Sequence, residues 1–161
     1  IRWNTCDVCR TYIANASWLV YRSCQLNFNL FSDKMQILVV DDKQAILNSL
    51  EKLLSSQGYL VDSAIHGLAA SEKLQNKHYD LLIIDHLMPI MNGIQLIKHV
   101  RQSAVFANTP IIFMTTQGHS AVKSLCNIDL FTAVIDKPID EQNLVKLINK
   151  LLSPNTLYQL L

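Results

Sequence analysis

Short strand-like runs alternate with segments of helical periodicity from residue 35 onward, and this alternation constrains the fold more than any other feature. Ile37–Val40 and Leu81–Ile84 are apolar at every position, and Ile111–Met114 repeats the pattern after Pro110. Strands that are buried on both faces read as continuous apolar runs of this kind. Two further short strands are expected at residues 60–64 and 132–136. The pattern predicts an α/β fold with a parallel sheet between two layers of helices.

A helix is expected after each of the five strands. The first has apolar residues at helical spacing from Ile46 to Leu54 and stops at Gly58, and the last has the most one-sided stripe, from Leu144 to Leu151. A less regular helix is expected near residues 120–127. Right-handed crossovers favour a doubly wound five-stranded parallel sheet of order 2-1-3-4-5, with five helices on its two faces. Such a sheet places its site at the carboxyl ends of the strands.

Composition narrows the class of protein. The chain has 161 residues, half of them apolar, 17% charged and a net charge of +1, which is a globular composition without a basic field for nucleic acid. Its apolar runs are too short to span a membrane. We expect one domain at residues 35–152, which would be cytoplasmic with a reduced thiol. Residues 1–34 have no clean periodicity and stay unassigned, with poor order or a non-native origin expected, and residues 153–161 form a tail or the start of a linker.

Polar residues end four of the apolar strands. Asp41 and Asp42 follow the first, Asp85 ends the third, Thr115 ends the fourth and Lys137 follows the fifth. In a parallel sheet all of these lie at one edge. Two unit charges 4 Å apart repel by about 4 kcal/mol at an effective dielectric near 20, so three converging carboxylates require a counter-charge. An all-oxygen site of this kind favours Mg²⁺, and with Lys137 it could stabilise a phosphoryl group during transfer.

At these positions the chain resembles the receiver domains of two-component response regulators. The resemblance covers residues 35–152, about three quarters of the chain, and each of its motifs is weak alone but specific in this order and spacing. The matching segments are Ile37–Asp42, Asp85–Gly93, Pro110–Thr115 and Lys137-Pro138.

The resemblance implies a role for each residue of the acidic cluster. Asp85 matches the phosphoacceptor. Asp42 and Asp85 match direct Mg²⁺ ligands, together with the backbone carbonyl of Leu87, and Asp41 matches the acid that reaches the metal through water.

The resemblance also implies a switch. Lys137 matches the lysine that contacts the phosphoryl oxygens, Thr115 matches the hydroxyl that moves toward them on activation, and the bond before Pro138 is expected to be cis. Val134 departs from the family pattern, because an aromatic residue usually occupies that position. The aromatic half of the switch is therefore missing.

The function implied is a phosphoacceptor that takes a phosphoryl group from a phosphohistidine of a sensor histidine kinase or histidine phosphotransfer protein. It would be no enzyme beyond its self-catalysed transfer and autodephosphorylation, its downstream protein partner is open, and no DNA-binding domain is expected after Leu152. One alternative is an interaction domain that does not switch by phosphorylation, which Val134 favours slightly. Another is a small hydrolase with an aspartyl-phosphate intermediate, but no insertion is long enough for its cap domain.

Cysteine and histidine patterns suggest little further chemistry. Cys6-x-x-Cys9 and Cys24 stand in a segment without histidine, so a four-ligand zinc site is incomplete there. No thioredoxin-like pattern surrounds the CxxC pair. The five histidines show no ligand spacing, and most are expected to be exposed.

Overall fold

The computed structural model describes residues 34–118 and 130–153. The chain divides into two units, Ile1–Asp33 and Lys34–Leu161, and all described residues belong to the second. The expectations for residues 1–33, for a helix near 120–127 and for the tail from 154 lie outside the described residues.

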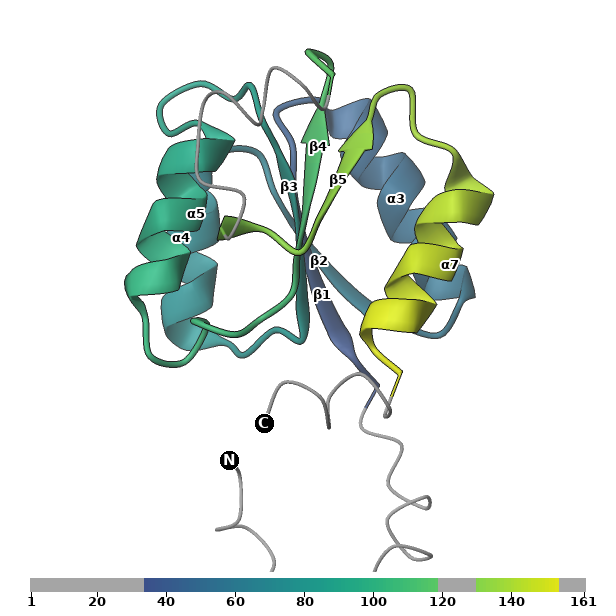
Figure 1. The fold of residues 1–161 in the computed structure, drawn as a ribbon, viewed down its shortest axis with the longest axis horizontal. Helices are drawn as coiled ribbons and strands as arrows, with labels where there is room; N and C mark the ends of the chain where they lie inside the picture. Colours follow the sequence, from purple (N-terminus) through teal and green to yellow (C-terminus); the bar gives the residue numbers. More distant parts are fainter. Residues whose placement is uncertain (1–33, 119–129, 154–161) are drawn as a thin grey trace, which may run out of the picture. The chain divides into compact units, whose positions relative to one another are not determined.

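Five parallel strands form one sheet of order β2-β1-β3-β4-β5, as predicted. All of them point the same way, so their carboxyl ends lie along one edge. Figure 1 shows this edge at the top of the view. The strands are β1 (Gln36–Val40), β2 (Leu60–Ala64), β3 (Leu81–Asp85), β4 (Ile111–Thr115) and β5 (Ala133–Asp136).

The continuous apolar runs are explained by burial on both faces of the sheet. In β1, Leu38 and Val40 belong to one hydrophobic core and Ile37 and Val39 to the other. Every residue of β3 and β4 is buried. At about 25 cal/mol per Å² of apolar surface, these two cores supply most of the driving force for folding.

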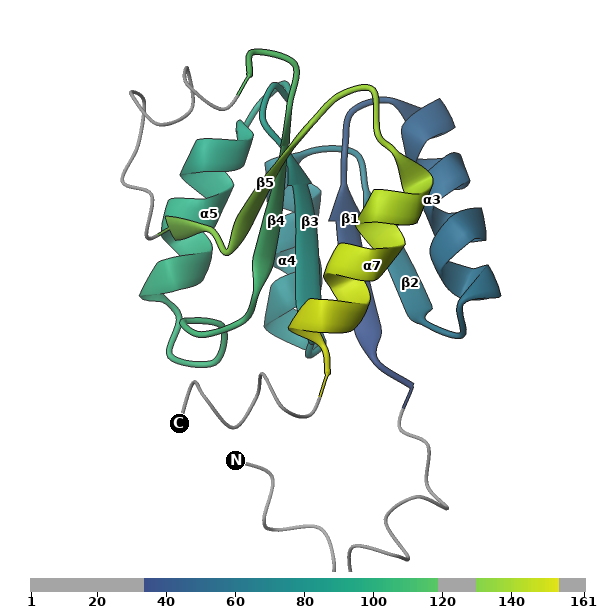
Figure 2. The ribbon, with the colours of Figure 1, turned by 45° about the vertical axis from the view of Figure 1, so that its right-hand side comes forward.

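Four helices lie within the described residues and cover both faces of the sheet (Figures 1 and 2). Figure 1 places α4 and α5 on one side and α3 and α7 on the other, in agreement with the two cores. No helix of this described part is both long and apolar enough to cross a membrane. The helices are α3 (Gln44–Ser56), α4 (Gly67–Asn76), α5 (Gly93–Gln102) and α7 (Glu141–Leu151).

Local signals set the helix ends. Gly58 follows α3 with φ +91°, a left-handed conformation that glycine adopts without steric cost, and its N–H donates to the carbonyl of Ser55. Asn92 and Gln95 form a reciprocal capping box at the start of α5. The His66 side chain accepts a hydrogen bond from Ala69 at the start of α4. His66 is therefore a capping residue and is only half exposed.

Two polar clusters stabilise the edge opposite the site. Arg101, at the end of α5, donates hydrogen bonds to the carbonyls of Phe106, Ala107, Thr109 and Leu130 at 2.8–3.0 Å. The guanidinium thereby supplies donors to four carbonyl groups of two irregular segments, of which the Phe106 carbonyl also accepts from the Thr109 N–H.

A second cluster joins β2 to the start of β3. Asp62 accepts hydrogen bonds at 2.7 Å from both Lys77 and Tyr79. Burial alone would raise the pKa of Asp62, but these two partners outweigh it and hold the pKa below its ordinary value.

Candidate functional site

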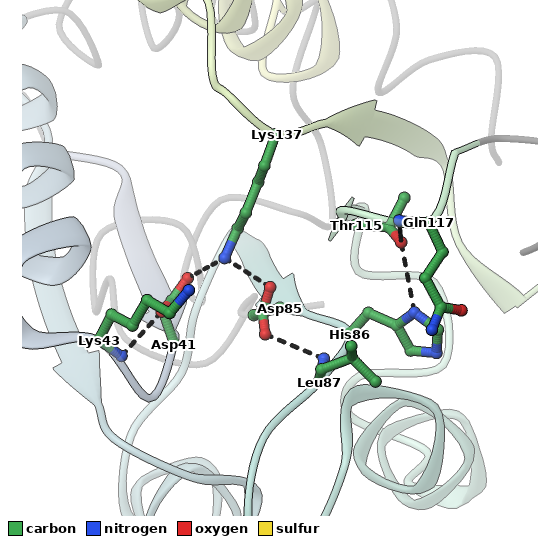
Figure 3. Close-up of polar contacts among 8 residues, drawn as sticks. All are labelled: Asp41, Lys43, Asp85, His86, Leu87, Thr115, Gln117 and Lys137. Atoms are coloured by element: carbon green, nitrogen blue, oxygen red, sulfur yellow. Dashed lines mark hydrogen bonds and ion pairs between the residues drawn. The ribbon is translucent and has the colours of Figure 1, made fainter.

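A lysine joins two buried carboxylates at the carboxyl edge of the sheet. Lys137 Nζ lies 2.5 Å from Asp41 Oδ2 and 2.5 Å from Asp85 Oδ1. The side chains of Asp41, Asp85 and Lys137 are 0%, 7% and 10% exposed. Figure 3 shows the ammonium between the two carboxylates. The three residues follow or end β1, β3 and β5, so parallel strand direction brings them together.

The charges of these three side chains do not cancel, because Asp41 and Asp85 share a single ammonium, that of Lys137. Burial raises the pKa of the Asp85 carboxyl, and the neighbouring Asp41 adds to that effect, while Lys137 and the Leu87 N–H act against it without cancelling it. Burial alone would lower the pKa of Lys137, but its hydrogen bonds to the two carboxylates prevail and raise that pKa. One ammonium therefore serves two carboxylates, and the site can take further positive charge.

The loop after β3 holds Asp85 in place. Leu87 N–H donates to Asp85 Oδ2 at 2.9 Å, and Gly93 N–H donates to the His86 carbonyl at 3.0 Å. A Cβ on Gly93 would stand 2.1 Å from the Asp85 carbonyl oxygen, so only glycine allows α5 to begin this close to the strand. In the same loop Ile90 has φ +69° and a side chain that is largely exposed. That conformation is strained for a β-branched residue.

Thr115 lies at the end of β4 with its hydroxyl turned to His86. Its oxygen accepts a hydrogen bond from Gln117 N–H at 3.0 Å and lies 3.3 Å from His86 Nδ1 (Figure 3). Thr115 is fully buried and His86 is 5% exposed. Of the four histidines that the structure describes, His78 and His99 are exposed, as expected for most of them, whereas His66 is partly buried and His86 is buried.

The remaining residues of the predicted site lie around this trio. Asp42 is exposed, in contrast to buried Asp41. Lys137 forms its ion pairs with Asp41 and Asp85 and not with Asp42. Leu87 is exposed beside Asp85. Val134 is half-buried against the core on the α5 side of the sheet, and the Lys137–Pro138 bond is cis.

The donor chemistry of this edge suits a hard divalent cation. Among the described residues no three Asp, Glu, His or Cys side chains stand together as a ready-made metal site. Mg²⁺ does not need such a group, because it is commonly held by one or two carboxylates with water and phosphate oxygens. Asp85, exposed Asp42 and the Leu87 carbonyl supply oxygen donors only. The residues present therefore fit Mg²⁺.

Fold and site together define an α/β module with an acidic cluster at the carboxyl edge of its sheet, and comparison with known families identifies its class. The response regulator receiver domain family matches residues 37–149. The chain belongs to this family, as the sequence resemblance implied.

Individual relatives support the same assignment. The chain is 44% identical over 89 residues to the chemotaxis protein CheY1 of Helicobacter pylori, covering 54% of this chain and 72% of CheY1. The structure of CheY4 from Vibrio cholerae superposes with a TM-score of 0.70 at 30% identity, covering 74% of this chain and 99% of that one. A receiver domain of a histidine kinase from Syntrophus aciditrophicus gives 0.67 at 28% identity, covering 73% of this chain and 89% of that one.

Other relatives are longer proteins. The match covers 58% of the regulator ycf29 of Porphyra purpurea and 38% of the transcriptional regulatory protein DltR of Streptococcus agalactiae. The chain thus spans less than two thirds of the length of these regulators.

Proposed function

We propose that the chain accepts a phosphoryl group on Asp85 from a phosphohistidine of a sensor histidine kinase or histidine phosphotransfer protein, with Mg²⁺. The observation that carries this proposal is the buried pair of carboxylates, Asp41 and Asp85, joined by Lys137 at the carboxyl edge of the sheet. Membership of the receiver family supports it. The protein would work in the cytoplasm and would act on no separate substrate.

In the transfer step a carboxylate oxygen of Asp85 attacks phosphorus in line, and the bond from phosphorus to the histidine nitrogen breaks. The nitrogen keeps the electron pair and the donor imidazole leaves. Lys137 holds the phosphoryl oxygens and offsets their charge, while Leu87 N–H keeps the carboxylate oriented. Asp42, Asp85 and the Leu87 carbonyl would hold Mg²⁺, with Asp41 acting through water, and the bound ion would supply further positive charge to the transferring group.

Phosphorylation would then change the conformation at this edge. A new dianionic group beside Lys137 weakens the hold of Lys137 on Asp41 and requires further hydrogen-bond donors. The proposed signal is the movement of Thr115 toward the phosphoryl group. Because Val134 is short and stiff about χ1, no aromatic ring can turn inward on β5.

A second candidate function is an interaction domain of receiver fold that does not switch. The observation that favours it is again Val134, whose side chain packs against the core and leaves that position without an aromatic ring. Intact Asp85, Lys137 and Thr115 make it the weaker candidate.

The proposal is tested by phosphorylation of the full chain with acetyl phosphate or phosphoramidate, with and without Mg²⁺, followed by intact-mass measurement. We expect the wild type to gain one phosphoryl group only with Mg²⁺, and Asp85→Asn to gain none. Asp80→Asn is the matched control, because Asp80 lies just before the same strand at its other end. Phosphorylation of Asp85→Asn at the wild-type rate would falsify the assignment.

A further inference from the structure

Thr115 makes its polar contacts with Gln117 and His86 and not with Asp85. Its oxygen accepts from Gln117 N–H and lies within hydrogen-bond distance of His86 Nδ1, and Figure 3 shows all three side by side. Asp85 has other partners, Lys137 and Leu87. The hydrogen bond between Thr115 and His86 keeps the Thr115 oxygen against the imidazole, whether the hydroxyl or Nδ1 donates the proton.

The imidazole of His86 is itself held in place. Its backbone N–H donates to the Met114 carbonyl at 2.9 Å, which extends the β3–β4 pairing by one residue. Its ring centroid lies 5.3 Å from that of Phe113, and Phe113 stacks on Phe131 at 5.4 Å with an angle of 9°. Packing this dense leaves the ring little freedom to follow a moving partner.

From these contacts we infer that His86 is a positioning residue for the phosphoacceptor site. It holds the Thr115 hydroxyl away from Asp85 in the unphosphorylated protein, and so sets how readily the phosphorylated conformation forms. This inference rests on the proposed function and adds a residue to it.

The physical reason is competition for one hydroxyl. A phosphoryl group on Asp85 carries oxygens that need donors, and Thr115 has the buried hydroxyl at the end of the adjacent strand. To move toward that group the Thr115 oxygen must leave His86 Nδ1, and a ligand shifts an equilibrium only by its differential contacts with the two states. The His86 contact therefore weakens the response by the worth of one neutral hydrogen bond, about two- to tenfold in an equilibrium constant.

Two substitutions at His86 distinguish the effect of its hydrogen bond to Thr115 from the effect of its ring packing. His86→Phe keeps the aromatic packing on Phe113 and removes Nδ1, whereas His86→Asn keeps a polar group near the Nδ1 position and removes the ring. The control is His99→Phe, which makes the same histidine-to-phenylalanine change at an exposed position near the end of α5. Each variant of the full chain is titrated with beryllofluoride and Mg²⁺, in the wild-type and Thr115→Val backgrounds. Phosphorylation of Asp85 is measured in parallel by mass.

We expect His86→Phe to bind beryllofluoride about two- to tenfold more tightly than the wild type. His86→Asn and His99→Phe should stay within about twofold, which is the lower limit of that effect. In Thr115→Val the gain from His86→Phe should vanish, because no hydroxyl remains to be released. An unchanged affinity in His86→Phe with normal phosphorylation, or the same gain in Thr115→Val, overturns the inference alone. A wild type that takes neither phosphoryl nor beryllofluoride overturns the proposed function as well.

A measurement on the wild type covers the case in which His86→Phe does not fold. The side-chain rotamer of Thr115 and the imidazole nitrogen shifts of His86 are followed by NMR with and without beryllofluoride. We expect both to change together on binding. A Thr115 rotamer that stays the same in the bound form contradicts the inference.

Discussion

Lys137 Nζ lies 2.5 Å from Asp85 Oδ1, and the same nitrogen contacts Asp41, so one cation compensates two buried carboxylates. Lys137→Met should lower the free energy of unfolding by about 3 kcal/mol, because it leaves these charges without a partner. Urea denaturation without Mg²⁺ measures this. Lys146→Met, at an exposed position of α7, should cost less than about 0.5 kcal/mol. In an Asp85→Asn background the loss from Lys137→Met should be smaller, and an equal loss would contradict the coupling.

Magnesium should stabilise the folded protein through Asp42 more than through Asp41. Binding at 100 times the Kd raises stability by about 2.7 kcal/mol in a protein with one site. Asp42→Asn should lose most of the Mg²⁺-dependent rise in thermal midpoint, and Asp41→Asn should lose less of it, because Asp41 is expected to reach the metal through water. Asp140→Asn, at the cap of α7, is the control. Equal Mg²⁺ affinities in the first two variants would remove the distinction.

Arg101 should be intolerant of lysine. The guanidinium reaches four carbonyl oxygens from two nitrogen atoms, and an ammonium cannot match that geometry. Arg101→Lys should lower the free energy of unfolding by about 1–3 kcal/mol, the usual loss when buried carbonyls go unsatisfied. Gln102→Lys introduces lysine at the next, exposed position and should be near neutral. Thermal denaturation at neutral pH distinguishes the two, and similar midpoints would refute the role of Arg101.

Asp62 should make stability depend on acid pH. Its pKa is lowered in the folded protein, so its contribution is fully present above the unfolded pKa of about 3.9 and disappears as pH falls through the folded pKa. Asp62→Asn should cost about 1 kcal/mol from pH 8 to about 5, a value limited by the partial exposure of Asp62 and Lys77. As pH falls below about 4 the difference between the two proteins should shrink, and it should disappear below the lowered pKa of Asp62 in the folded protein. Urea denaturation across this range checks it, and a difference that is constant down to pH 3 would contradict the sign.

Ile90 should be replaceable with a gain in stability. Asparagine tolerates the left-handed conformation far better than a β-branched residue, so Ile90→Asn should add about 1 kcal/mol, or about 4 °C in thermal midpoint. Val105→Asn makes a similar change of polarity at an exposed apolar residue that is not among the positive-φ positions of the described chain. It should give no comparable gain. Equal effects of the two would show that exposure and not backbone strain is responsible.

The fold could be predicted from sequence because its signals are local. Continuous apolar runs, a one-sided stripe such as Leu144 to Leu151 and the stop at Gly58 each act within a few residues. Strand direction then places Asp41 and Lys137 at one edge, although 96 positions separate them. Parallel topology converts sequence order into proximity, and the acidic cluster could be anticipated for that reason.

Other features of the site and of the opposite edge could not be predicted from the sequence, because they depend on rotamers and on contacts between elements. His86 follows a strand and resembles any loop residue, and only pairing with Met114 and packing on Phe113 show that it is buried. The four acceptors of Arg101 likewise come from irregular segments without a sequence signature. Nothing in the composition of the loop after Asp85 indicates that Ile90 adopts a left-handed conformation.

The parallel sheet has a consequence for how such a protein can diversify. Asp41, Asp85 and Lys137 lie together at one edge of the sheet. Arg101 and the hydrogen bonds of Asp62 lie toward the other edge, and fully buried strands separate the two groups. Substitutions that change the chemistry of the site and substitutions that stabilise the scaffold therefore fall on separate parts of the described chain. Changes of this kind tend to add independently. Under the proposed function, a lineage could thus acquire a new phosphodonor at one edge while compensating mutations accumulate at the other.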